Sequence, residues 1–69
     1  MKLSTRNIIK GKVVDVKVGQ VAAKVKMDIG GGNVITSTIT VEAVNELGIK
    51  VGDEVYALIK ASSVMIGKE

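Results

Sequence analysis

The chain has 69 residues and a net charge of +3, and it contains no Cys, His, Trp, Phe or Pro. Without Cys and His, the chain cannot form disulfides, thiolate or imidazole metal sites, or the usual nucleophile–base pairs of catalysis. A chain of this size buries only about 60% of the surface that its unfolded form exposes, so we expect association with further copies to stabilise it. The positive charge favours anionic ligands without identifying one.

Hydrophobic residues make up 46% of the chain. No apolar run approaches the roughly 20 residues that a membrane-spanning helix needs, and residues 1–10 lack the apolar core of a signal peptide. No linker, low-complexity segment or long repeat interrupts the chain. We therefore expect one cytoplasmic domain over residues 1–69, with no membrane partner.

The first part of the chain predicts three strands. Residues 8–18 are rich in β-branched side chains, and their apolar positions change from odd to even numbers, which predicts a bulge or bend within residues 11–14. Strict alternation over residues 21–29 and 34–41 predicts the next two strands. Residues 30–33, Gly-Gly-Gly-Asn, tolerate positive φ and predict a hairpin loop between them.

The rest of the chain predicts one short helix and two strands. Thr40 is a candidate helix N-cap and Gly48 a stop residue, so we expect a helix over residues 40–48. Residues 54–60 and 63–67 predict a fourth and a fifth strand. This order predicts an all-β fold, a five-stranded OB-like small barrel with one short helix between strands 3 and 4; an open sheet or a sandwich is the alternative.

Residues with catalytic chemistry are few. The seven acidic residues are scattered over different predicted elements, which argues against a metal site or an acid–base pair. Residues 30–32 are glycines, but they lack the lysine and the strand-to-helix context of a phosphate-binding loop. The remaining nucleophile candidates are Ser/Lys pairs such as Lys60 with Ser62. We therefore expect a protein that is not an enzyme.

Three segments combine hydrogen-bond donors with an absence of carboxylates, namely residues 4–7, 36–40 and 60–63. Hydroxyls, a guanidinium, an ammonium and backbone N–H groups are what a fully deprotonated oxyanion requires. The same side chains are also common on exposed strands. The composition of these segments alone leaves both interpretations open.

Residues 4–13, STRNIIKGKV, resemble the SARNQLKGKV start of the molbindins, the small molybdate-binding Mop proteins. Residues 35–48 and 51–66 follow the pattern of the same family in order, so the resemblance covers the full length. It implies an OB-like barrel that assembles as a homo-hexamer, a trimer of dimers, with oxyanions held between subunits. The implied ligand is molybdate, with tungstate as its isostere, and the implied role is intracellular molybdenum storage or homeostasis.

The resemblance also assigns site residues by motif. The family often has Ala where this chain has Thr5, and Ser where it has Ala43. The residues that match the dimer-interface site or flank it are Ser4, Thr5, Arg6, Thr40, Lys60, Ala61 and Ser62. A second site near the three-fold axis of the family matches the turn formed by Val18, Gly19 and Gln20.

Two other functions compete with oxyanion binding. An OB-like face can bind single-stranded nucleic acid, but such sites stack bases on aromatic side chains, and this chain has Tyr56 alone. We therefore expect no nucleic-acid partner. A purely structural oligomer without a ligand is the other alternative.

Overall fold

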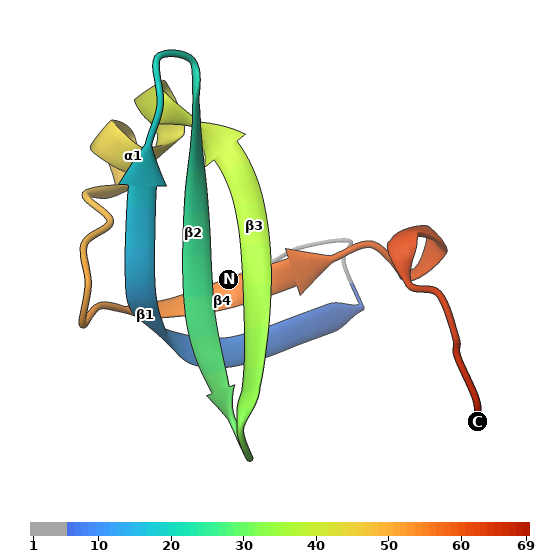
Figure 1. Ribbon diagram of the computed structural model, residues 1–69. Helices are drawn as coiled ribbons and strands as arrows, with labels where there is room; N and C mark the ends of the chain where they lie inside the picture. The colour runs from blue at the N-terminus through green and yellow to red at the C-terminus, as the bar shows by residue number, and fades with distance from the viewer. Residues whose placement is uncertain (1–5) are drawn as a thin grey trace.

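The computed structural model describes residues 6–69, which form one antiparallel sheet with the strand order β3-β2-β1-β4 and a short helix at one end (Figure 1). The elements are β1 (Asn7–Val18), β2 (Ala22–Gly30), β3 (Asn33–Thr40), α1 (Val41–Leu47), β4 (Glu54–Ile59) and the 3₁₀ turn η1 (Ala61–Ser63). The predicted β-rich fold, hairpin and helix are therefore confirmed. Among these residues, no helix is long and apolar enough to cross a membrane.

Strand β1 pairs with a different strand along each of its halves because it bends in the middle. Its first half pairs with β4 and its second half with β2, and Lys12 has a partner on both sides, Glu54 and Asp28. The β1–β2 register shifts between Val13 and Asp15, which is the predicted bulge. The bend turns β4 across the β2–β3 hairpin, so the sheet forms a half-barrel (Figure 1).

Gly11 lies at this bend, where β1 approaches β2 closely. A Cβ atom at this position would lie 2.5 Å from Cε of Met27 and 2.7 Å from the backbone oxygen of Asp28. The methionine end can move, but the backbone oxygen is held in the sheet. A residue without a side chain is therefore required for the two strands to meet.

We expect Gly11→Ala to lower the free energy of unfolding by about 1–3 kcal/mol, because the added methyl group overpacks the sheet. Denaturant unfolding monitored by circular dichroism measures the change. Gly67→Ala is the matched control, since a Cβ atom there meets nothing within 4 Å. Equal stability of the two variants would contradict the steric explanation.

Helix α1 begins and ends with the predicted caps. Oγ1 of Thr40 accepts a hydrogen bond from the backbone N–H of Ala43 at 3.0 Å, and Gly48 adopts the left-handed conformation with φ 63°. Val44 on this helix packs into the small core, so α1 covers one end of the half-barrel. The buried apolar residues are Val13, Ala23, Val25, Met27 and Val44.

Most large apolar side chains of the described chain stay outside this core. Leu47 is 71% exposed, Tyr56 53%, and Met65 and Ile66 are each more than 90% exposed. Exposed apolar surface on this scale is typical of an interaction site rather than of an isolated monomer.

The predicted fifth strand over residues 63–67 is wrong for the described chain, which has four strands and an unclosed barrel. The chain instead turns locally after β4, since the N–H of Ser63 donates to the Lys60 oxygen at 2.8 Å and the N–H of Val64 to the Ala61 oxygen at 3.3 Å. The last residues then leave the sheet (Figure 1). A segment forms a β-strand when it is hydrogen-bonded to a neighbouring strand. Residues 64–69 pair with no strand among the described residues.

Candidate functional site

Arg6 and Lys60 directly follow the last β1–β4 pair at one end of the sheet. The last described pair of β1 and β4 is Asn7 with Ile59, so Arg6 and Lys60 are the next residues to face each other in this register. Both residues are exposed. Two like charges that face each other across strands repel, so this position favours an anion that neutralises both.

The turn after Lys60 adds neutral donors to the two cations. The N–H groups of Ala61 and Ser62 donate to no acceptor among residues 6–69, while the Ser62 hydroxyl can also donate. The structure therefore brings together four predicted site residues from both ends of the sequence: Arg6, Lys60, Ala61 and Ser62. The predicted residues Ser4 and Thr5 lie outside the described residues.

Carboxylates are absent from the sequence segments that form this cluster. No Asp or Glu occurs in residues 1–14 or 55–68. The ion pairs of the described residues are Lys10–Glu54 at 3.2 Å and Lys50–Asp53 at 3.3 Å, and neither involves Arg6 or Lys60. The hydrogen bond to Glu54, with the charge of that carboxylate, raises the pKa of Lys10 above its usual value. Lys10 thus has its own counter-ion, and Arg6 and Lys60 have none among residues 6–69.

Thr40 does not join this cluster within one chain. It pairs with Ala22 at the other end of the sheet, where β3 runs into α1 (Figure 1). Its hydroxyl oxygen caps the helix, so its proton remains able to donate to a further group. The predicted interface site is therefore divided between two places on the molecule, and a second copy would have to bring its Thr40 to Arg6 and Lys60 to complete it.

The second predicted site, at the turn after β1, lies beside two cations that the sequence did not point to. A shallow hollow of about 370 Å³ is lined by Val18 and Gly19 together with Lys17, Lys24 and Thr38, but not by the predicted Gln20. Lys17 faces Lys24 across the hairpin, and Lys24 faces Thr38 on β3. The sequence held one indication of this pair: Lys17 and Lys24 lie at equal distances on either side of the turn, so they become neighbours when the hairpin forms.

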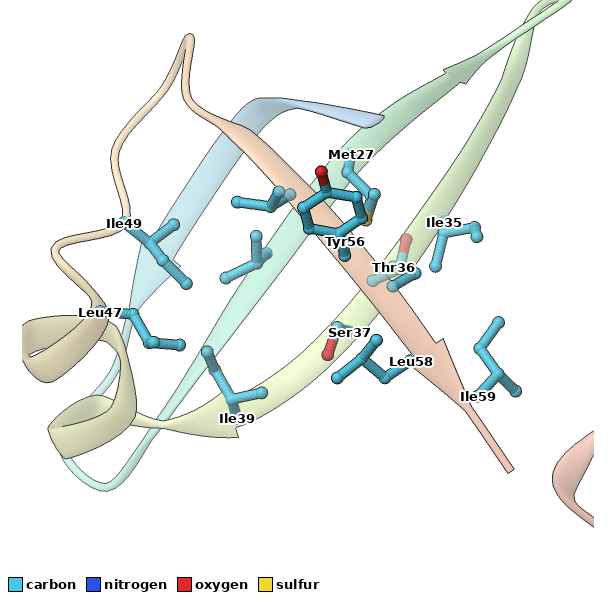
Figure 2. Close-up of a pocket in the computed structure, with 13 residues that line it drawn as sticks. Met27, Ile35, Thr36, Ser37, Ile39, Leu47, Ile49, Tyr56, Leu58 and Ile59 are labelled. Atoms are coloured by element: carbon cyan, nitrogen blue, oxygen red, sulfur yellow. The ribbon is translucent and has the colours of Figure 1, made fainter. Parts of the chain in front are cut away.

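A larger groove of about 470 Å³ runs between the open edges of β3 and β4 and reaches α1 (Figure 2). It carries no charged residue, which makes it unsuited to an oxyanion. The side chains that Figure 2 shows around it are mostly apolar: Met27, Ile35, Ile39, Leu47, Ile49, Tyr56, Leu58 and Ile59, with Thr36 and Ser37 beside them. This groove was not predicted, because it forms only when two strands far apart in the sequence curve toward each other.

Comparison with known proteins decides the family. The TOBE domain model matches residues 3–66, which is nearly the whole chain. This chain belongs to the TOBE domain family. The matched range includes Arg6, Thr40 and Lys60, and so all three parts of the divided site lie within the TOBE domain. The resemblance to the Mop proteins is thereby confirmed.

Relatives of this TOBE domain are named for molybdenum. The "Probable molybdenum-pterin-binding protein" of Haemophilus influenzae is 58% identical over 69 residues, all of both chains. Among solved structures, MopII from Clostridium pasteurianum is 49% identical with a TM-score of 0.91, over 97% of this chain and all of that one. A molybdate-binding protein from Sporomusa ovata is 37% identical with a TM-score of 0.92, over 99% of this chain and all of the other. No catalytic activity appears in these names.

Proposed function

We propose that this TOBE domain is a non-enzymatic protein that binds molybdate, and its isostere tungstate, at sites between copies of the chain. The observation that carries the proposal is the register that sets Arg6 opposite Lys60, next to the Ala61 and Ser62 N–H groups that donate to no acceptor within residues 6–69, with no ion pair to either cation among those residues. A guanidinium and an ammonium neutralise a dianion, while N–H and hydroxyl groups fix its orientation. The names of the relatives support molybdate as this dianion.

A site whose two charged groups are pure donors favours molybdate over phosphate. Hydrogen phosphate carries a proton at neutral pH, and that proton needs an acceptor that neither Arg6 nor Lys60 provides. A buried donor without an acceptor costs about 1–3 kcal/mol. Sulfate has no proton but is smaller than molybdate, so in a pocket of molybdate size its oxygens lie farther from several donors and each hydrogen bond weakens.

Three features support a site between copies. Thr40 is separated from Arg6 and Lys60 within one chain, the described core is small, and the groove between β3 and β4 exposes apolar side chains along two unpaired strand edges. Such a groove has room for a strand of a second copy, and the exposed apolar residues 64–66 of that copy have the chemistry to line it. A second copy would then supply the fifth strand that the single chain lacks.

The higher assembly and the cellular role complete the proposal. We propose a hexamer built as a trimer of such dimers, with the hollow beside Lys17, Lys24 and Gly19 as the second class of oxyanion site. Facing lysines without an acid between them again favour an anion. Reversible binding of this kind serves storage and homeostasis of molybdenum in the cytoplasm.

The test is a calorimetric titration of molybdate, tungstate, sulfate and phosphate into protein whose assembled mass is measured by light scattering. We expect molybdate and tungstate to bind with similar affinity, and sulfate and phosphate at least about tenfold more weakly. Saturating molybdate should also raise the melting temperature, because a ligand that binds only the folded assembly stabilises it. Unchanged thermal unfolding at millimolar molybdate would reject the proposal.

A further inference from the structure

Asn7 makes a side-chain hydrogen bond that joins distant parts of the chain, and apart from the Lys10–Glu54 ion pair it is the one such side-chain contact among residues 6–69. Its Nδ2 donates to the backbone oxygen of Ile59 at 3.1 Å, across from β1 to β4. The four other side-chain hydrogen bonds of the described chain that are not ion pairs join residues two or three positions apart, in turns and at the helix cap. Asn7 is also half-buried, whereas its neighbour Arg6 is exposed.

This hydrogen bond adds to the ladder pairing of Asn7 with Ile59 in holding the peptide that precedes Lys60. In a trans peptide the carbonyl and the following N–H point in opposite directions, and no cis peptide occurs in the described chain. Because the Ile59 carbonyl points to Asn7 on β1, the N–H of Lys60 points away from β1. The Lys60 carbonyl accepts from Ser63 at 2.8 Å, so the N–H of Ala61 points out of the turn by the same reasoning.

The peptide before Lys60 is thus held by the β1–β4 ladder together with the Asn7 side chain, and the peptide after it by the hydrogen bond from Ser63. The support matters because Arg6 and Lys60 repel each other at the end of the β1–β4 ladder. An amide keeps the two strands together at this end without adding a charge to a site that must stay free of carboxylates. The backbone of both cations is then already ordered before the anion binds. This lowers the conformational entropy cost of binding.

We infer that Asn7 is a positioning residue of the oxyanion site: it does not contact the anion, and it acts by holding the Ile59–Lys60 peptide. The inference rests on the proposed function, since it assigns a supporting residue to the same site. The alternative is that Asn7 stabilises the fold alone, in which case its effect on anion binding is independent of Lys60.

The experiment compares Asn7→Leu, which keeps the size of the side chain but removes the donor, with Asn33→Leu. Asn33 is the matched control because its Nδ2 also donates to a backbone oxygen, that of Gly30 at 3.2 Å, but in the exposed loop between β2 and β3 and not to the Ile59–Lys60 peptide. Molybdate affinity is measured by calorimetry on the full-length assembly, and the melting temperature without ligand is recorded beside it. We expect Asn7→Leu to weaken binding about tenfold and Asn33→Leu to leave it within twofold of the wild type.

A double-mutant cycle with Lys60→Met separates positioning from a purely structural role. If Asn7 acts through Lys60, Asn7→Leu weakens binding much less in the Lys60→Met background than in the wild type. Equal weakening in both backgrounds, or no weakening in the wild type, overturns the inference. If the wild type itself does not bind molybdate, the proposed function fails instead, so the two failures are distinct.

A measurement on the unmodified protein covers the case in which Asn7→Leu does not fold. The side-chain amide signals of Asn7 and Asn33 are followed by NMR during a molybdate titration. We expect the Asn7 signal to shift with ligand occupancy while the Asn33 signal stays in place. Equal responses of the two signals would overturn the positioning role.

Discussion

Replacing Arg6 or Lys60 by a neutral residue of similar length, as in Arg6→Gln or Lys60→Met, should weaken molybdate binding at least about tenfold. A hydrogen bond to a charged group contributes roughly 1.5–3 kcal/mol, and each residue supplies one of the two cations of the proposed site. The ligand-free protein should keep or slightly raise its melting temperature, because either change removes the repulsion between the facing cations. Calorimetry and thermal unfolding measure the two effects.

Lys10→Met is the matched control for the loss of one positive charge. Lys10 lies on the same strand as Arg6, but its ammonium already pairs with Glu54 at 3.2 Å. We expect this variant to bind molybdate within about twofold of the wild type, since exposed ion pairs contribute only about 0–1 kcal/mol. Wild-type affinity in both Arg6→Gln and Lys60→Met would show that the facing pair is not the oxyanion site.

The local elements could be predicted from the sequence because each has a short-range cause. Alternation over β2 and β3 depends on period two, the caps of α1 depend on Thr40 and Gly48, and the β1 bulge follows from the change of apolar phase. The predicted fifth strand had no such support. Residues 64–66 are apolar enough for a strand, but a strand also needs a pairing edge, which depends on how the rest of the assembly is arranged.

The sequence predicted which residues form the candidate site, but not where they lie in space. The family resemblance pointed to Arg6, Thr40 and Lys60, but their placement depends on strand pairing between residues far apart in the sequence. The β1–β4 register makes Arg6 and Lys60 face each other, and the β2–β3 register takes Thr40 to the other end of the sheet. The pair Lys17 and Lys24 was missed because neither lies in a motif; only the register of the first hairpin makes them neighbours.

Charging the groove should dissociate the assembly. We expect the double variant Leu47→Lys with Leu58→Lys to be monomeric at micromolar concentration, with the folded circular dichroism spectrum retained. Both leucines line the groove and are exposed in the single chain, so lysine costs the monomer little, whereas a partner would have to cover two ammonium groups. Burial of each leucine is worth about 1.5–3 kcal/mol, so the loss for two exceeds a hundredfold in the dissociation constant even before that desolvation is counted. Light scattering gives the mass.

The same variant tests whether the oxyanion site depends on assembly. Arg6 and Lys60 remain intact in it, but Thr40 lies at the other end of the sheet and needs a second copy to reach them. We therefore expect the monomeric variant to bind molybdate at least about tenfold more weakly than the wild type, through the loss of donors rather than of charge. Val51→Lys is the control, since Val51 is 63% exposed and does not line the groove. A monomer that binds molybdate with wild-type affinity would place the complete site within one chain, and an unchanged mass would show that the groove is not where the copies meet.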